Sequence, residues 1–368
     1  MSTLKVDGIR SNSASSDAIT LASDGTCTAN ITNRSNRNLV INGAMQVAQR
    51  GTSSTTSGYG SVDRFAVYYT GTDEAPTHAQ GDVASGTSPY IRGFKKTLKI
   101  TNGNQTSGAG SGDYIFARTI LEAQDIASSG WRYMYSNQYI TLSFWVKSSV
   151  AQNFHGYLRS LDGTAQLYPF ETGSLSADTW TKITKTIIGN SNITLDNNSE
   201  GGLEIVVAPF WGTDYTGSVS LNAWAAFSNS TRTPDNTTTW YTTNDATFEI
   251  TGVQLEVGSV ATDFEHRSYA QELALCQRYF YRWNPGGTSS EAYFLYAGGY
   301  TSHSTSAFFE HTYAPPMRAT PTATTPSVNS QSGGSWSLYS TRARWICSAT
   351  DAGSGAVFTS QIDFSAEL

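Results

Sequence analysis

The stretch ITLSFWVKS, residues 140–148, decides the fold of this 368-residue chain. Its apolar residues Leu142, Phe144 and Val146 alternate with other residues, among them Trp145. Successive side chains of a β-strand point to opposite faces, so the three apolar residues share one face and Trp145 lies on the other. The pattern therefore predicts a strand with one face in a core.

Seven further runs favour strands, because β-branched and aromatic residues dominate them. They are VDRFAVYYT (62–70), KKTLKIT (95–101), YIFARTI (114–120), NFHGYLRS (153–160), WTKITKTII (180–188), LEIVVAPF (203–210) and FEITGVQLEV (248–257). Clusters of Gly, Asn, Ser and Asp separate the runs, and no strand–helix alternation appears, which is typical of a β-sandwich. In the last run the apolar phase changes at Gly252, which predicts a β-bulge there.

The two ends of the chain are organised differently. Residues 1–38 carry too little apolar surface for a core of their own, so we expect an extended segment that anchors to or interlocks with other chains. Ser268 and Gln271 form a capping box that predicts a short helix, and Asn284 to Gly287 (NPGG) ends this connector. Strand-like runs follow again: EAYFLYAGGY (291–300), TSAFFEHTY (305–313), SWSLYSTRARWIC (335–347) and AVFTSQIDF (356–364).

The fold class is thus predicted as all-β, in four parts. They are an N-terminal segment (1–38), a β-sandwich (39–267), a helical connector (268–284) and a smaller C-terminal β-domain (285–368).

Composition and charge exclude several classes of partner. The formal net charge is −6, and the longest basic cluster is Lys95-Lys96, which argues against nucleic acid as a partner. No stretch approaches the roughly 18 apolar residues of a membrane-spanning helix, so we expect no membrane insertion. Cys27, Cys276 and Cys347 are odd in number and widely spaced. They indicate free thiols in a protein assembled in a reducing cytoplasm.

Motifs for catalysis and metal binding are sparse. No nucleophile elbow, zinc-protease or phosphate-loop motif occurs, so we expect no enzymatic activity and no cofactor. Asp196, Asn198 and Glu200 precede Gly201 as in the first half of a calcium loop, but the twelfth position is Val207. The pattern favours a polar turn, with a structural Ca²⁺ as the alternative.

Five motifs resemble the structural proteins of tailed bacteriophages, especially tail-fibre or receptor-binding proteins of marine and cyanobacterial phages. They are NLVINGAMQVAQRG (38–51), VDRF (62–65), SFWVKS (143–148), ITGVQLEVGSVATDFEHRSYAQELALCQRYF (250–280) and FSAEL (364–368). The sandwich region also looks like the jelly-roll carbohydrate-binding modules. The resemblance implies a jelly-roll β-sandwich and supplies no catalytic residue.

The resemblance also implies a function. It points to a homotrimeric tail fibre of the virion, assembled in the host cytoplasm, that recognises a host surface polysaccharide or lipopolysaccharide. Its N-terminal segment would join other phage tail or capsid proteins. Two alternatives stay open. One is a capsid-surface (head) fibre or decoration protein without a receptor role. The other is a polysaccharide depolymerase, because glycosidase carboxylates come from distant strands and leave no local motif.

A candidate carbohydrate site follows if residues 141–147 and 154–159 form a hairpin. Trp145 would then lie opposite His155 and diagonal to Tyr157, with Arg159 on the same outward face. A pyranose suits such a face, because its C–H side stacks on a ring while its hydroxyls seek polar groups. The alternative is that a neighbouring protomer covers this face and that Trp145 is an interface anchor.

Overall fold

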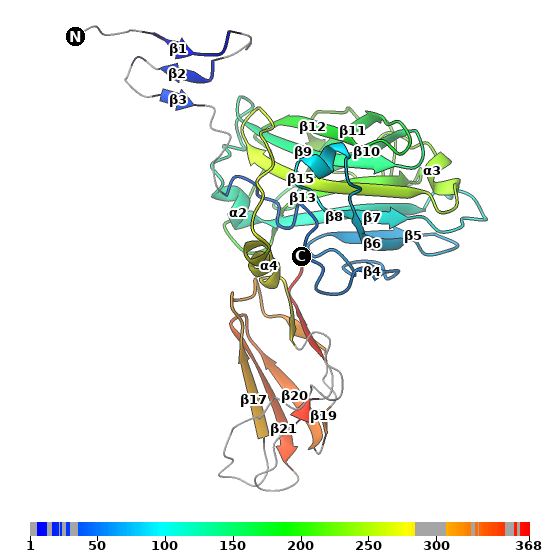
Figure 1. Cartoon of the computed structure of the whole chain (residues 1–368), viewed down its shortest axis with the longest axis vertical. Coiled ribbons are helices and arrows are strands. Elements are labelled where there is room, and N and C mark those ends of the chain that lie inside the picture. The colour runs from blue at the N-terminus through cyan, green and yellow to red at the C-terminus, as the bar shows by residue number, and fades with distance from the viewer. Residues whose placement is uncertain are drawn as a thin grey trace.

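The computed structural model describes residues 6–12, 17–21, 23, 27–29, 36–283, 307–324, 328–329, 331–349, 357–358 and 361–368. This part of the chain consists mainly of β-strands, which confirms the all-β class (Figure 1). Its centre is a sandwich of two six-stranded antiparallel sheets. We name them the β9 sheet and the β10 sheet after one strand of each.

The β9 sheet has the order β12-β9-β15-β7-β6-β4. Its strands are β4 (Ser53–Ser54), β6 (Thr77–Asp82), β7 (Lys96–Thr101), β9 (Tyr139–Ser148), β12 (Thr181–Ile188) and β15 (Thr247–Val257). The β10 sheet has the order β14-β11-β10-β13-β8-β5. Its strands are β5 (Ala66–Thr70), β8 (Tyr114–Glu122), β10 (Asn153–Ser160), β11 (Gln166–Ser174), β13 (Gly201–Trp211) and β14 (Ala225–Ala226). Each of the eight runs predicted between residues 62 and 257 overlaps one of these strands.

The core lies between the two sheets, on the faces that alternation predicts. Leu142 and Phe144 of β9 are fully buried there, and Phe154 and Leu158 of β10 enter the same cluster. The ring centroids of Phe144 and Phe170 are 6.2 Å apart across the core. Apolar alternation has therefore assigned the inward face of both strands correctly.

The predicted hairpin between β9 and β10 is wrong. β9 pairs with β12 and β15, whereas β10 pairs with β11 and β13, so the two strands belong to opposite sheets. The four residues 149–152 cross from one sheet to the other. A connection of four residues spans at most about 13 Å, and stacked sheets lie about 10 Å apart. Such a connection is therefore long enough to join two strands of opposite sheets as well as two neighbouring strands of one sheet.

Four short helices occur in the described residues, and one of them was predicted. They are α1 (Ser88–Ile91), α2 (Ala123–Ala127), α3 (Thr239–Thr242) and α4 (Tyr269–Gln277). α4 begins with the expected capping box, in which Ser268 and Gln271 bond reciprocally. Cys276 on this helix is a free, buried cysteine, as predicted, and burial raises the pKa of its thiol. The side chains of Cys27 and Cys347 lie outside the described residues.

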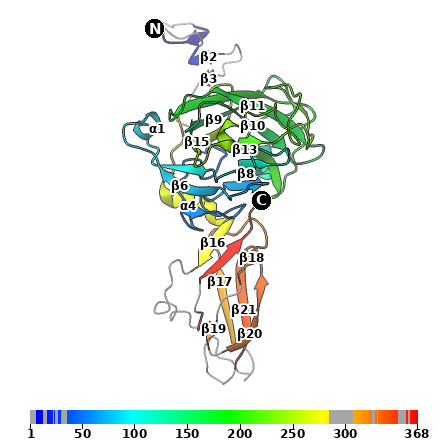
Figure 2. The same cartoon turned by 90° about the vertical axis from the view of Figure 1, so that its right-hand side faces the viewer.

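Smaller sheets occupy the two ends of the chain (Figures 1 and 2). Near the N-terminus, β1 (Gly8–Ile9), β2 (Ile19–Leu21) and β3 (Cys27–Ala29) form a three-stranded sheet. The C-terminal strands are β16 (Phe280–Trp283), β17 (Ala307–Thr312), β18 (Thr322–Ala323), β19 (Val328–Asn329), β20 (Gln331–Leu338), β21 (Arg342–Ala349), β22 (Val357–Phe358) and β23 (Ile362–Ser365). The run predicted at 291–300 lies outside the described residues.

The last residues of the chain return to the sandwich. β23 pairs with β16, which immediately follows α4. Beyond β23, Glu367 accepts a hydrogen bond from Arg64 and forms an ion pair with Arg50 at 3.2 Å. The Tyr59 hydroxyl donates to the carbonyl oxygen of Leu368 at 3.0 Å. The C-terminal β-domain predicted for 285–368 therefore ends on the sandwich surface.

Candidate functional site

A cleft of about 290 Å³ lies on the outer face of the β9 sheet, the face turned away from the core. One wall comes from the excursion between β6 and β7 that carries α1, and the other from the segment that follows β15. The lining residues are Arg92, Phe94, Ser143, Trp145, Lys182, Gly252, Thr262, Asp263, Phe264 and His266. Segments far apart in the sequence thus build one concave site.

Trp145 and Gly252 form the floor of the cleft. The Trp145 side chain packs with Phe94 in a small cluster outside the main core, and 7% of its surface stays exposed. Gly252 has φ +63°, and the strand register shifts between Thr251 and Gln254, so the predicted β-bulge is confirmed. A Cβ at Gly252 would lie 2.7 Å from Phe94 and 3.2 Å from Trp145. Only glycine, which has no Cβ, allows the rings of Phe94 and Trp145 to pack directly against the bulge.

Aromatic rings from both walls pack against one another. The ring centroids of Phe94 and Phe264 are 4.9 Å apart in an edge-to-face arrangement, and His266 lies 5.0 Å from Phe94. His266 Nε2 donates to the carbonyl oxygen of Arg92 at 2.8 Å. This hydrogen bond ties the segment after β15 to the α1 excursion, so the two walls hold each other in place.

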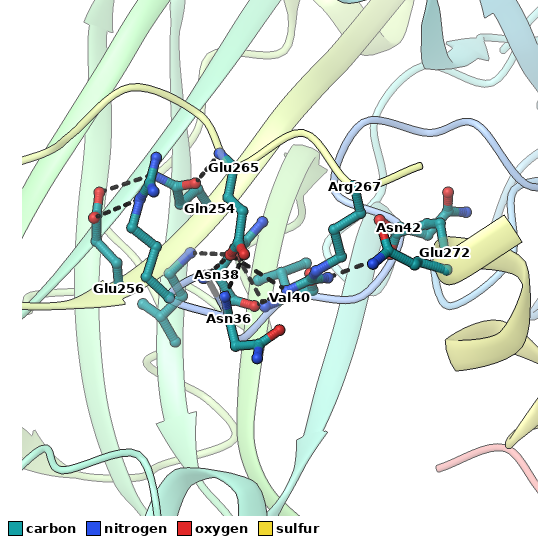
Figure 3. A network of polar contacts seen from close by, with 12 residues as sticks. Asn36, Asn38, Val40, Asn42, Gln254, Glu256, Glu265, Arg267 and Glu272 are labelled. Atoms are coloured by element: carbon teal, nitrogen blue, oxygen red, sulfur yellow. Dashed lines mark hydrogen bonds and ion pairs between the residues drawn. The ribbon is translucent and has the colours of Figure 1, made fainter. Parts of the chain in front are cut away.

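A network of polar contacts fixes the segment after β15 on the sheet (Figure 3). Glu265 donates its backbone N–H to Gln254 at 2.8 Å, and its carboxylate accepts from the backbone of Asn38 at 2.7 Å. Glu256 accepts from the Thr262 hydroxyl at 2.6 Å and from Gln254 at 2.8 Å. Gln254 and Glu256, on the outward face of β15, are buried beneath this segment. The wall of the cleft is therefore preorganised.

Three charged side chains reach the cleft. The Arg92 guanidinium carbon lies 5.4 Å from the centre of the Trp145 ring, and Arg92 hydrogen-bonds the carbonyl oxygen of Ser88. Lys182 of β12 is directly opposite Trp145 in the strand register. Asp263 supplies a carboxylate from the other side. All three side chains are exposed, and within the described part of the chain none of them forms an ion pair.

Only one of the four predicted site residues lies in this cleft. Trp145 forms its floor, whereas His155, Tyr157 and Arg159 lie on β10, on the outer face of the opposite sheet. They do point away from the core, as predicted, but the sandwich separates them from Trp145. The predicted constellation of four residues therefore does not exist, because β9 and β10 do not pair.

The outer face of the β10 sheet is closed. Tyr157 is 2% exposed and packs with Trp211 beneath the half-buried rings of Tyr215 and Phe227. Burial raises the pKa of the Tyr157 hydroxyl, and burial lowers the pKa of His155. We name this group of rings and the arginines stacked on them the sealed face.

Arginines complete the sealed face. Arg159 contacts Glu204 at 2.9 Å, and Arg118 contacts the same carboxylate at 3.2 Å. The Arg159 guanidinium also lies 4.5 Å from the Phe227 ring, and that of Arg118 lies 4.6 Å from the Tyr68 ring. Both cations thus have a carboxylate and an aromatic ring as partners, so neither is left over for a ligand.

Sequence reasoning missed most of the cleft. The segment that supplies Asp263, Phe264 and His266 stands out only as part of the phage-like run 250–280. Its return across the sheet has no local signal, because part of the network that holds it joins residues far apart in the sequence, as between Asn38 and Glu265. The phase change at Gly252 was the one local signal of the floor.

The half calcium loop forms no ligand cluster. Asp196 donates its backbone N–H to Asp162, and Glu200 pairs with Arg318 at 3.3 Å. Within the described ranges, no group of three His, Cys, Asp or Glu side chains is placed to hold a metal ion. None of the helices in the same ranges has the length and apolar character needed to cross a membrane.

Comparisons with known proteins give structural similarities only. No protein-family model matches the sequence, and no curated protein is significantly similar to it. The structure is similar to the enzymatically active domain of tailspike protein 4 of bacteriophage CBA120, with 13% identity and a TM-score of 0.32. That match covers 60% of this chain and 22% of the tailspike domain.

Carbohydrate-binding modules are also among the similar structures. The N-terminal cellulose-binding domain of Cellulomonas fimi β-1,4-glucanase C is 10% identical over 58% of this chain and 100% of that domain, with a TM-score of 0.29. The C-terminal family 22 carbohydrate-binding module of Clostridium thermocellum Xyn10B is 11% identical over 60% of this chain and 98% of that module, with a TM-score of 0.29. The functional assignment of this chain therefore depends on its own residues.

Proposed function

We propose that this chain is a carbohydrate-binding protein and that the cleft at Trp145 holds the saccharide. The main observation behind this proposal is that the Trp145 ring lies at the floor of the cleft with polar side chains around it. A pyranose ring places its C–H face on an aromatic ring and its hydroxyls on donors and acceptors. Beside Trp145, Ser143 offers a hydroxyl, Lys182 an ammonium and Asp263 a carboxylate.

The dimensions and rigidity of the cleft support a small saccharide. A volume of about 290 Å³ is at the lower end of ligand sites, so about one sugar ring is enclosed while the rest of a chain extends outside. The wall residue His266 is held by a hydrogen bond to the backbone of Arg92, and the floor residue Gly252 lies in a β-bulge of the paired strand β15. A preformed site lowers the entropic cost of binding.

We propose binding without hydrolysis. Glycoside hydrolysis ordinarily needs two carboxyl groups about 5–9.5 Å apart. Asp263 supplies the one carboxylate among the described residues that line the cleft. A binding role uses this group as an acceptor for sugar hydroxyls. The depolymerase alternative predicts new reducing ends when the protein is incubated with a polysaccharide, and we expect none.

We further propose that the protein is a homotrimeric tail fibre of a phage virion whose cleft recognises a host surface polysaccharide or lipopolysaccharide. Two phage-like motifs support this, because they form one structural unit. Leu39 donates its backbone N–H to Leu255 at 2.9 Å, and Val253 donates to Gly43 at 2.9 Å. These contacts join the motif at 38–51 to the motif at 250–280 beside the cleft.

Replacement of the floor residue tests the binding site. We expect Trp145→Ala to weaken binding to bacterial surface polysaccharides on a glycan array by roughly tenfold or more, because a truncated aromatic anchor costs that much. Trp224→Ala is the matched control, since its indole N–H donates to the carbonyl oxygen of Ile188. Thermal denaturation of both variants separates a lost site from a lost fold.

A second variant keeps the proposal falsifiable if Trp145→Ala fails to fold. Asp263→Ala removes an exposed side chain, so we expect an unchanged melting temperature and weaker binding. Wild-type affinity in both variants would contradict the proposed site. The fibre assignment has its own tests: the native mass should be three times that of the chain, and labelled antibodies should mark the tail rather than the capsid of the particle.

A further inference from the structure

We infer that the saccharide bound in the cleft is acidic and carries a carboxylate, as a uronic acid does. This inference rests on the proposed function and names its ligand class. It comes from the sign of the net charge around Trp145, which is opposite to the sign of the net charge of the whole chain. The chain as a whole has a formal net charge of −6, yet its cleft presents more positive than negative groups.

Cations near the cleft fall into two groups. Lys147 pairs with Glu249 at 3.0 Å, and Lys96 pairs with Asp82 at 2.6 Å, both on the β9 sheet. Lys182 lies on the same sheet but forms no ion pair with a described residue. Lys99 of β7 and Lys185 of β12 also form no ion pair with a described residue, but neither of them lines the cleft. Among the described residues, Lys182 is therefore the lysine that the cleft offers to a ligand.

Arg92 and Lys182 converge on the same indole. Lys182 is the direct cross-strand partner of Trp145, and directly paired residues project from the same face of a sheet. Arg92 approaches from the α1 excursion, with its guanidinium carbon 5.4 Å from the ring centre. A sugar ring seated beside Trp145 therefore has two cationic donors within reach of one substituent. Charge-assisted hydrogen bonds to a carboxylate are the strongest that such donors make.

The acidic groups nearby do not cancel this charge. Glu256 and Glu265 are occupied by Thr262 and by the backbone of Asn38. Asp263 lines the cleft, but no ion pair joins it to Arg92 or to any other cation in the described residues. Two cations and one carboxylate leave one positive charge, which one carboxylate per bound sugar residue balances.

Matched pairs of polymers test the inference. The probes are polygalacturonate, alginate and hyaluronan, each compared with its own methyl ester, which keeps the sugar backbone and removes the charge. We expect at least one acid form to bind about tenfold or more tightly than its ester. Raising the salt concentration from about 50 to 500 mM should weaken the acid form and leave the ester unchanged, because salt screens exposed charges.

Variants assign the preference to the two cations. Arg92→Gln with Lys182→Gln should abolish the difference between acid and ester. Lys95→Gln is the matched control, because Lys95 lies on the same excursion but stacks on Tyr90, 3.3 Å from the ring centre. All three substitutions change exposed side chains, so the fold should be unaffected.

The outcomes separate this inference from the proposed function. Equal binding of acids and esters, or binding to neutral polysaccharides alone, would overturn the acidic ligand and leave carbohydrate binding intact. A preference that survives Arg92→Gln with Lys182→Gln would also overturn the assignment. Failure of the wild-type protein to bind any polysaccharide, neutral or acidic, would overturn the proposed function itself.

Discussion

The two outer faces of the sandwich place their arginines in different surroundings. On the β10 sheet, Arg118 and Arg159 share the buried carboxylate of Glu204 and lie over aromatic rings. On the β9 sheet, Arg92 lies over Trp145 without a carboxylate partner among the described residues. The first arrangement is neutralised and covered, whereas the second keeps a charge facing a cleft.

This difference teaches that outward-facing rings on a sheet do not by themselves make a binding platform. Tyr157 and Trp211 face outward on β10 and β13, but the rings of Tyr215 and Phe227 pack over them. Arg232 of the sealed face also forms no ion pair with a described residue, but it lies over the rings of Trp211 and Tyr215 and helps to cover them. What distinguishes the cleft is that Arg92 and Lys182 line a concave site beside Trp145. The sealed face should therefore govern stability, and the cleft should govern binding.

Removal of the charge shared on the sealed face should have the largest effect on stability. In Glu204→Gln, Arg118 and Arg159 lose their common carboxylate, and we expect the free energy of unfolding to fall by about 3 kcal/mol. This is the low end for a broken buried pair, because both arginine side chains keep 22% exposure. Chemical denaturation measures the loss, and saccharide affinity should stay unchanged.

The matched control is Asp82→Asn on the other sheet. Asp82 pairs with Lys96, but its side chain is 82% exposed, so its loss should not measurably change stability. If the free energy of unfolding fell equally in the two variants, the ion pairs of the sealed face would contribute no more to stability than an exposed ion pair does.

Much of the fold was predictable because it depends on local signals. Alternation placed Leu142 and Phe144 in the core, and the phase change located the bulge at Gly252. β6 and β11 were missed, because the polar sequence THAQGD and a run with Pro169 in its middle do not resemble strands. Local patterns thus identified most strands and the face that each one buries.

The candidate site was not predictable in the same way. Alternation gives the face of Trp145 but not its neighbour, since a four-residue connection leads either to a hairpin or to the opposite sheet. The true strand partners of Trp145, Lys182 and Thr251, come from β12 and β15. Strand order is set by the packing of the whole sandwich, so no stretch of sequence near Trp145 encodes it.

A substitution at the floor should have an intermediate effect and should affect binding. Gly252→Ala places a Cβ 2.7 Å from Phe94 and forces alanine to φ +63°, so we expect a loss of about 2 kcal/mol and a displaced Trp145 floor. Saccharide binding should weaken by several-fold, measured by titration calorimetry.

Gly86→Ala is the control for backbone strain alone. Gly86 has φ +82°, but nothing lies within 4 Å of the point that an alanine Cβ would occupy there. We expect a loss of about 1 kcal/mol with unchanged affinity. If both variants bind saccharide like the wild type, the floor at Gly252 is not part of the binding site.

The smallest effect concerns His155 on the sealed face. Burial lowers its pKa below the ordinary value of about 6.5, so the folded protein holds it neutral while the unfolded chain takes up a proton more readily. The contribution of His155 to stability is therefore fully present above that pH and is lost as the pH falls below about 6.5.

The pKa of His78 is shifted in the same direction, so the pH profile of the wild-type protein sums several groups. The difference between wild type and His155→Gln isolates one of them: the variant should lose less stability between pH 7.5 and 5, as followed by chemical denaturation. Parallel profiles would mean that water reaches His155, and that the β10 sheet is less completely closed than its packed rings indicate.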